Sequence, residues 1–154
     1  TPGWVMNLIR DFQDKITCGL YEAVYSLEGE PLEKVMQGQS HACGAAYLKL
    51  YGLPEKMPLD EFLDRIRYTG PSQIKIERDG DVIEWNELHE GGCVCPLVKR
   101  NVIRLDQKLC VCGANWVKYL FEEVAQTPVD IEIIETVATG AENCRFQVRL
   151  KAHT

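Results

Sequence analysis

The stretch from Ala114 to Leu150 reads ANWVKYLFEEVAQTPVDIEIIETVATGAENCRFQVRL, and its apolar period changes partway along. Residues 114–125 place large apolar side chains on one side of a helix, which Pro128 ends. Residues 129–137 and 144–150 are rich in β-branched and apolar types, and a polar stretch with a glycine separates them. The pattern predicts a long helix followed by a final antiparallel hairpin.

Further upstream the sequence predicts helices and then another hairpin. Four helices are expected, over residues 3–25, 31–37, 42–51 and 58–69. The first of them carries one apolar stripe, formed by Trp4, Val5, Ile9, Phe12, Ile16, Leu20 and Val24. Asp79-Gly80 lies between two short alternating runs and favours the tight turn of a hairpin, because glycine tolerates positive φ.

The order of these elements predicts the fold class. Helices grouped apart from antiparallel strands indicate an α+β fold, with N-terminal helices packed on an antiparallel sheet and a long helix before the final hairpin. We expect one compact domain, with a helical part at 1–69 and a hairpin, cysteine-rich connection, helix and hairpin at 70–154. The connection at 88–112 is long, and long connections in compact domains are often functional.

Composition excludes several classes of function. The chain has 154 residues and a formal net charge of −6, which disfavours broad binding to nucleic acid or to an anionic membrane surface. No stretch approaches the ~18 apolar residues of a membrane span, and the first residues lack a signal-peptide pattern. Seven cysteines in a chain with a good core indicate a reducing compartment, so we expect a cytoplasmic protein.

Two C-x-C pairs, Cys93-Val94-Cys95 and Cys110-Val111-Cys112, are the main chemical signal. In extended backbone, residues i and i+2 point to the same side, so each pair would present two sulfur atoms to one ion. Two such pairs would supply four ligands for tetrahedral zinc or for an iron–sulfur cluster. The sequence therefore predicts a thiolate metal site, with zinc as the expected cofactor and iron or an iron–sulfur cluster as the alternative.

The surroundings of the pairs add a candidate ligand and leave alternatives open. His89 lies four residues before Cys93 and would be a further metal ligand. Basic residues between the pairs would lower the thiol pKa values; they are Lys99, Arg100, Arg104 and Lys108. The cysteines could instead be small buried apolar residues, or redox or nucleophilic thiols. Cys43, at a predicted helix start near His41, is open to a packing role or a reactive one.

The C-terminal half resembles a known family. The residues on which the resemblance rests are Cys112-Gly113, the helix through Trp116 and Tyr119, the strand 131–135, and the ending Gly140-Ala141-Glu142-Asn143-Cys144-Arg145-Phe146. This order resembles the 4-vinyl-reductase-like domains and the related aminothiazoline-carboxylate-hydrolase-like proteins. The resemblance implies helices packed on an antiparallel sheet in a small-molecule-binding or sensory module.

The resemblance also implies a ligand set for structural zinc. Cys112 would match the first ligand and Cys144 the last, and Glu135 lies near the acidic position. The strand cysteine of those families has no counterpart, because Thr136 stands close to its place. Cys110, Cys93, Cys95 or His89 would then have to replace the missing ligand.

Two functions follow as hypotheses. The first is a metal-containing small-molecule-binding or sensory domain with a cysteine-rich site. The alternative is a small hydrolase or redox enzyme that uses a metal or a cysteine thiolate. The expected partner is a small-molecule ligand, with no nucleic acid and no membrane. A sensory module of this kind would most naturally form a homodimer, for which the N-terminal helix offers a surface.

Overall fold

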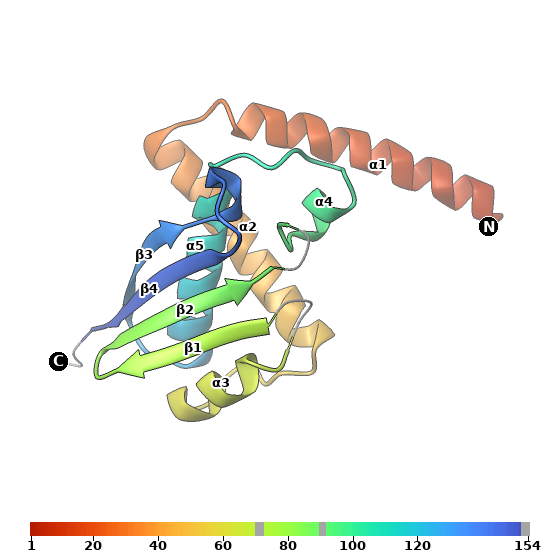
Figure 1. Ribbon diagram of the computed structural model, residues 1–154. Coiled ribbons are helices and arrows are strands. Elements are labelled where there is room, and N and C mark those ends of the chain that lie inside the picture. Colours follow the sequence, from red (N-terminus) through yellow and green to blue (C-terminus); the bar gives the residue numbers. More distant parts are fainter. Residues whose placement is uncertain (70–72, 90–91, 152–154) are drawn as a thin grey trace.

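The structure of the protein is a computed structural model, which describes residues 1–69, 73–89 and 92–151 (Figure 1). The fold is α+β, as the sequence predicts. The helices are α1 (Gly3–Val24), α2 (Gly29–Leu50), α3 (Leu59–Ile66), α4 (Pro96–Lys99) and α5 (Leu109–Tyr119), and a π-helical turn, Leu120–Val124, continues α5. The strands are β1 (Gln73–Asp79), β2 (Val82–Leu88), β3 (Val129–Glu135) and β4 (Cys144–Leu150). The domain boundary predicted at residue 70 lies outside the described residues.

The strands form one antiparallel sheet in the order β1-β2-β4-β3. Both predicted hairpins are present, β1–β2 and β3–β4, and β4 joins them by pairing with β2. The register aligns Ile76, Trp85 and Phe146 in one row across the sheet. All three side chains are buried, because alternate residues of each strand face the helices. This row forms the floor on which the helices pack.

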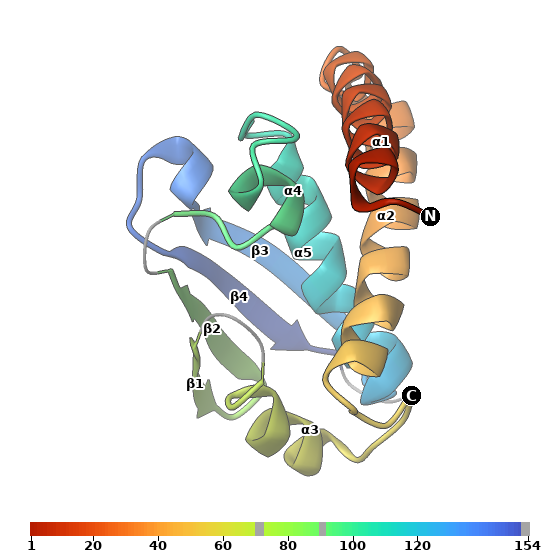
Figure 2. The ribbon, with the colours of Figure 1, turned by 90° about the vertical axis from the view of Figure 1, so that its right-hand side faces the viewer.

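The helices cover one face of the sheet in successive layers. Figure 2 shows α5 next to the sheet, with α2 and α1 beyond it. Helix α2 packs closely on α5, and Gly44 is buried where the two helices meet. A Cβ atom at Gly44 would lie 2.5 Å from Cδ1 of the Tyr119 ring, so the absence of a side chain permits this approach. The main core lies between α5 and the sheet, around Trp85, Phe121 and Phe62.

Several predicted boundaries differ from those of the structure. The helices predicted at 31–37 and 42–51 are one continuous helix, α2, because residues 38–41 contain no proline and helical backbone tolerates the single Gly38. The long connection is partly helical, since it contains α4, and α5 begins at Leu109 rather than at residue 114. This earlier start places the second C-x-C pair on a helix.

Helix α1 forms where the sequence predicts it, but its apolar stripe does not face the core. The buried residues of α1 are Tyr21 and Val24, near its C-terminus. They join a second, smaller apolar cluster with Met36 of α2 and with Ile103 and Leu109 of the connection and α5. Trp4, Phe12 and other members of the stripe are exposed, and α1 extends beyond the body of the molecule (Figure 1).

Candidate functional site

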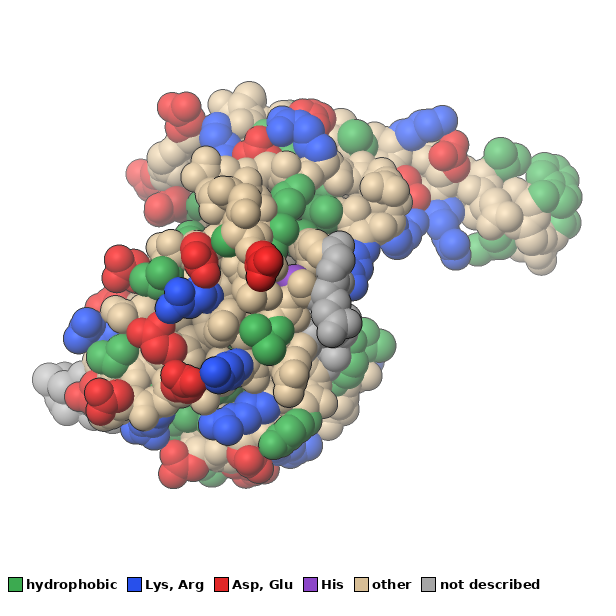
Figure 3. Space-filling view, in the orientation of Figure 1, with side chains coloured by type: hydrophobic (Ala, Val, Ile, Leu, Met, Phe, Trp, Pro, Cys, Tyr) green, Lys and Arg blue, Asp and Glu red, His purple; other side chains and the backbone are tan. Residues whose placement is uncertain are grey.

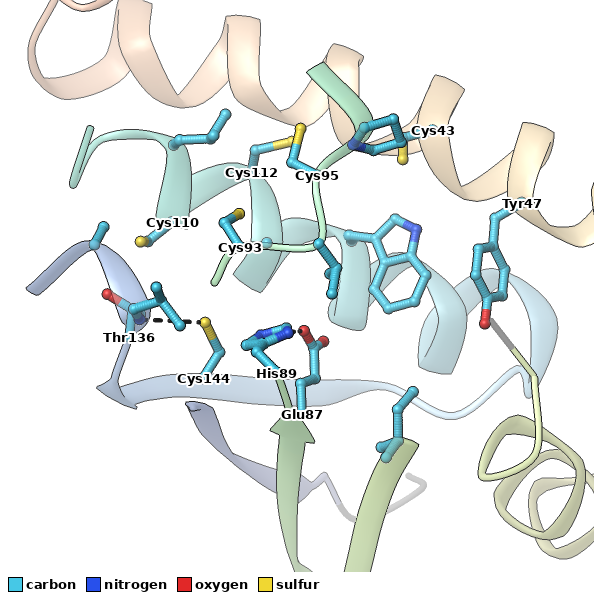
Figure 4. Close-up of a pocket in the computed structure, with 18 of the residues that line it drawn as sticks. Cys43, Tyr47, Glu87, His89, Cys93, Cys95, Cys110, Cys112, Thr136 and Cys144 are labelled. Carbon is cyan, nitrogen blue, oxygen red and sulfur yellow. Dashed lines mark hydrogen bonds and ion pairs between the residues drawn. The ribbon is translucent and has the colours of Figure 1, made fainter. Parts of the chain in front are cut away.

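An apolar cavity lies between α2, α5, the connection after β2 and the ends of β2 and β4 (Figure 4). Its volume is about 300 Å³. Aromatic and aliphatic side chains and six of the seven cysteines make up most of its wall. The lining residues are Cys43, Tyr47, Leu50, Tyr51, Thr69, Ile74, Glu87, His89, Cys93, Val94, Cys95, Pro96, Leu105, Leu109, Cys110, Cys112, Gly113, Trp116, Thr136, Val137, Ala138, Cys144 and Phe146.

The cysteines reach the cavity from different elements. Cys43 lies on α2, Cys93 and Cys95 on the connection, Cys110 and Cys112 on α5, and Cys144 on β4. All seven cysteines of the chain are free thiols. In Figure 4, Cys43, Cys95 and Cys112 lie on the α2 side of the cavity, and Cys93, Cys110 and Cys144 lie nearer the sheet. The sequence thus identified residues of a common cavity, although it assigned them another chemistry.

Burial keeps the thiols of five of these cysteines neutral. Desolvation raises the pKa of Cys112 and of Cys144 to about 12, and it also raises the pKa of Cys43, Cys93 and Cys110. The thiolate is the form that binds metals and attacks electrophiles. At neutral pH the cavity wall is therefore lined by small, weakly polar S–H groups.

Three of the four basic residues of the connection do not offset this burial, because they contact α1 or the turn that follows it. Arg100 contacts Asp14 at 2.8 Å, and Arg104 contacts Glu22 at 2.9 Å. The Nζ group of Lys108 donates hydrogen bonds to two backbone carbonyl oxygens at the end of α1 and just after it. The prediction that these side chains lower the thiol pKa values is wrong.

The two C-x-C pairs do not form one ligand set. Cys110 and Cys112 are helical, so their side chains leave the helix roughly 200° apart rather than on one side. Cys110 lies next to Thr136 and Ala138, whose hydrogen bonds partly oppose the effect of burial on its pKa. Cys112 instead lies near Cys43 and Cys95. The assumption of extended backbone at both pairs was the source of the error.

The donor geometry does not support a metal centre. Among the residues that the structure describes, no three His, Cys, Asp or Glu side chains form a group able to hold a metal ion. Glu135, the acidic ligand implied by the resemblance, is 43% exposed and lies 3.6 Å from Arg145. The metal-containing small-molecule-binding or sensory function predicted from the sequence is therefore wrong. Its alternative, an enzyme that uses a metal or a thiolate, is contradicted as well.

The wall beside Cys144 is fixed by local hydrogen bonds. Thr136 and Thr139 form a capping box around the 3-10 turn Val137–Thr139, and Thr136 is buried. The backbone N–H of Val137 donates to Sγ of Cys144 at 3.5 Å. This contact orients the Cys144 side chain toward the cavity (Figure 4).

Two ionisable side chains face the cavity at the end of β2. Glu87 Oε2 lies 3.6 Å from His89 Nε2, and the other oxygen of Glu87 accepts a hydrogen bond from the Trp85 indole N–H at 3.1 Å. Desolvation raises the pKa of Glu87 to about 7. Desolvation, and then the charge of Lys99, lowers the pKa of His89. Near neutral pH, His89 is uncharged and Glu87 is partly protonated.

The sequence predicts His89 as a metal ligand and gives no role to Glu87. The structure places His89 in the cavity wall, beside Glu87 rather than in a thiolate set. The strand alternation contains a signal for Glu87. Ile83, Trp85 and Glu87 are alternate residues of one strand, so the inward face that carries two buried apolar residues also carries the carboxyl group.

Comparison with solved structures shows which fold this is. The chain is similar to the crystal structure of a trafficking protein particle complex subunit 3 from Naegleria fowleri that is covalently bound to palmitic acid. The TM-score is 0.55 and the sequence identity 11%, and the alignment covers 93% of this chain and 98% of that chain. At this identity the likeness shows the fold alone. No curated protein sequence matches the chain.

The comparisons correct the family suggested by the sequence motif. The resemblance to 4-vinyl-reductase-like and aminothiazoline-carboxylate-hydrolase-like proteins is wrong, because neither the family comparison nor the structural neighbour supports it. A short ending around Cys144 was too little to identify a family. The family model that matches residues 75–154 is described as a family of unknown function, DUF6144. Because this match spans more than half of the chain, the protein belongs to the DUF6144 family.

Proposed function

We propose that this domain binds a long acyl chain in the cavity between α2, α5 and the sheet. The observation that carries the proposal is the apolar wall around a volume of about 300 Å³. This volume lies at the lower end of the roughly 300–1,000 Å³ range of small-molecule sites. Trp116 and Phe146 contribute aromatic surface, and the protonated thiols contribute small apolar groups between them.

Elementary energetics favour an aliphatic ligand. Each methylene group moved from water into such a wall contributes about 0.8 kcal/mol. The cavity offers few hydrogen-bonding groups relative to its apolar surface, so a largely polar ligand would leave its own groups unsatisfied. A protein of the same fold is covalently bound to palmitic acid, which supports an acyl chain over other apolar ligands.

We further infer that the domain acts in the cytoplasm as part of a larger assembly. Seven free cysteines fit a reducing compartment. In the part of the chain that the structure describes, no helix combines the length and apolar character needed to cross a membrane. The structural neighbour is named as a subunit of a complex, and the exposed apolar side chains of α1 support assembly for this chain too.

The proposal can be tested by filling the cavity. Gly113 lines it, and a Cβ atom there would lie 3.6 Å from Phe146, so Gly113→Leu extends a side chain into the space without a backbone clash. Gly38→Leu is the matched control, because Gly38 lies on an exposed part of α2 with open space around it. Native mass spectrometry with saturated fatty acids should show one bound molecule for wild type and for Gly38→Leu, and none for Gly113→Leu.

A chain-length series adds a quantitative expectation. Affinity should rise about fourfold for each added methylene until the cavity is full. Denaturing mass spectrometry of the protein isolated from cells would show whether the acyl chain is attached covalently. Absence of fatty-acid binding to the wild type, or equal binding to the Gly113→Leu variant, would contradict the proposal.

A further inference from the structure

Two polar side chains at the end of β2 are buried in the cavity wall without adequate partners. The side chain of His89 is 1% exposed, and that of Glu87 is 13% exposed. Among the described residues, neither ring nitrogen of His89 has a hydrogen-bond partner. The 3.6 Å separation of the two side chains is too long for a hydrogen bond between them. Buried polar groups without partners are rare in folded proteins and need an explanation.

The neighbouring groups do not supply the missing partners. The hydroxyl group of Tyr47 donates its hydrogen bond to the hydroxyl of Thr69 at 3.1 Å rather than to Glu87 or His89. The thiols of Cys93 and Cys144, on the connection and on β4, are neutral and only weak hydrogen-bonding groups. The pair therefore presents a ring N–H, a ring nitrogen acceptor and one carboxyl oxygen to an otherwise apolar cavity.

We propose that Glu87 and His89 bind the carboxyl group of a free fatty acid whose chain occupies the cavity. This inference rests on the proposed acyl-chain binding and specifies the head group of the ligand. A carboxyl group can accept from the ring N–H of His89 and can share a proton with Glu87 or with the ring nitrogen. An ester of the same chain has no proton to share, so it leaves one of the two side chains unsatisfied.

The experiment compares dodecanoic acid with its methyl ester, by competition against a fluorescent apolar probe. Wild type should prefer the acid by about tenfold or more, which corresponds to one lost buried hydrogen bond. His89→Phe keeps a ring of similar shape and removes both nitrogens, so the acid preference should vanish while ester binding remains. His41→Phe is the matched control, because His41 packs on Tyr119 outside the cavity lining.

The outcomes separate this inference from the function on which it rests. If wild type binds neither compound, the acyl-chain function fails. If wild type binds both equally, or if His89→Phe retains the preference for the acid, the head-group site is wrong and the acyl cavity stands. Glu87→Gln provides a second variant, which keeps the hydrogen bond from Trp85 and should also reduce the acid preference.

A different observation carries a second inference, which concerns α1. The exposed part of its apolar stripe, extended by Leu8, points away from the body of the protein. The residues Trp4, Leu8, Phe12, Ile16 and Leu20 are between 56% and 67% exposed, and Met6 and Ile9 beside them are 53% and 44% exposed. In Figure 3, apolar side chains gather at the free end of this helix. Large exposed apolar patches mark interaction sites.

The residues of α1 that face the body of the protein are already partnered. Tyr21 and Val24 are buried, and Asp14 and Glu22 form ion pairs with Arg100 and Arg104. These contacts fix the orientation of α1 and turn its stripe outward. The stripe is therefore not a core surface that a small rotation of the helix would bury.

We propose that the stripe of α1 packs against the same stripe of a second copy of this chain. Its members recur every four residues and are symmetric about Phe12. In an antiparallel pair with a twofold axis at Phe12, Leu8 of one copy lies beside Ile16 of the other. Ridges of residues four apart pack at a helix crossing angle of about −50°.

Area and charge support a second copy over a lipid surface. Seven large side chains at these exposures present on the order of 700 Å², close to the ~800 Å² that each partner buries in a stable complex. Leu20 also lines a groove of about 330 Å³ between α1 and α2. Helix α1 has two basic and three acidic residues, so an anionic membrane would not attract it.

Light scattering of the full chain at micromolar concentration tests this inference. The wild type should show twice the 17.5 kDa mass of one chain. Phe12→Glu places two carboxylates at the twofold axis and should give the single-chain mass, with an unchanged circular dichroism spectrum. Tyr68→Glu is the control, because Tyr68 is 80% exposed and lies outside α1. A monomeric wild type, a dimeric Phe12→Glu variant, or a monomer that binds vesicles through α1 would overturn the inference.

Discussion

Replacement of Glu87 by glutamine should change how stability depends on pH. The carboxyl group of Glu87 is buried in the cavity wall, and its pKa is raised from 4.5 to about 7, chiefly by desolvation. Glutamine has nearly the same shape, cannot ionise, and keeps an oxygen to accept the hydrogen bond from Trp85. The substitution therefore removes the cost of a buried charge and little else.

The sign and size of the effect follow from proton binding. As pH rises above 4.5, the carboxyl group ionises in the unfolded chain, whereas in the folded chain it retains its proton until about pH 7. The free energy of unfolding of the wild type therefore falls across this interval. The two pKa values correspond to a loss of about 3 kcal/mol, complete above about pH 8. The Glu87→Gln variant should lack this loss.

Urea unfolding of both proteins at a series of pH values measures the effect. The difference in unfolding free energy between variant and wild type should grow by about 3 kcal/mol from about pH 4.5 to about pH 8. Taking the difference cancels the contribution of His89, which has the opposite sign. Glu84→Gln, in the same strand, controls for the loss of one carboxyl group. A difference that does not vary with pH would refute the description of Glu87 as a buried, neutralised acid.

Two further predictions concern the packing of the helices and the state of the thiols. Gly44→Ala should lower the free energy of unfolding by about 1–3 kcal/mol, because the new Cβ atom would lie 2.5 Å from the Tyr119 ring. Gly38 has open space around it, so Gly38→Ala should raise the free energy of unfolding by up to about 1 kcal/mol. Urea denaturation measures both changes, and equal effects would contradict the close approach of α2 and α5. The thiols of Cys112 and Cys144 should react slowly with iodoacetamide at about pH 8 in the folded protein and rapidly in urea, because burial raises the pKa of each to about 12. Mass spectrometry of the labelled sites measures the rates, and rapid labelling of the folded protein would show that these thiols are ionised.

Local patterns predicted most of the fold. Both hairpins and the class of the fold follow from alternation and turn residues, which are local properties. The merger of two predicted helices into α2 shows the limit of that reasoning. The sequence predicts separate helices at 31–37 and 42–51, but packing of α2 on α5 supplies stability that local propensity does not express.

The candidate site was found in part, because the cysteines do converge on one cavity. What failed was the backbone conformation assumed for Cys110 and Cys112, since a helix separates two side chains that a strand would bring together. Burial keeps the cavity thiols protonated, and burial depends on residues distant in sequence, such as Trp116 and Thr136. No local pattern contains that information.

The sequence also does not predict that the stripe of α1 points outward. A stripe on a helix shows that something apolar covers it, but not whether that surface belongs to the same chain. The ion pairs of Asp14 and Glu22 with the connection settle the orientation, and they join residues more than 80 positions apart.

Nuclear Overhauser effects from carbon-13-labelled palmitic acid to the protein would test the acyl-chain cavity most directly. Contacts from the methylene protons to the rings of Trp116 and Phe146, lost in the Gly113→Leu variant and kept in Gly38→Leu, are the expected result. Contacts confined to exposed residues of α1 such as Phe12, or no contacts at all, would contradict it.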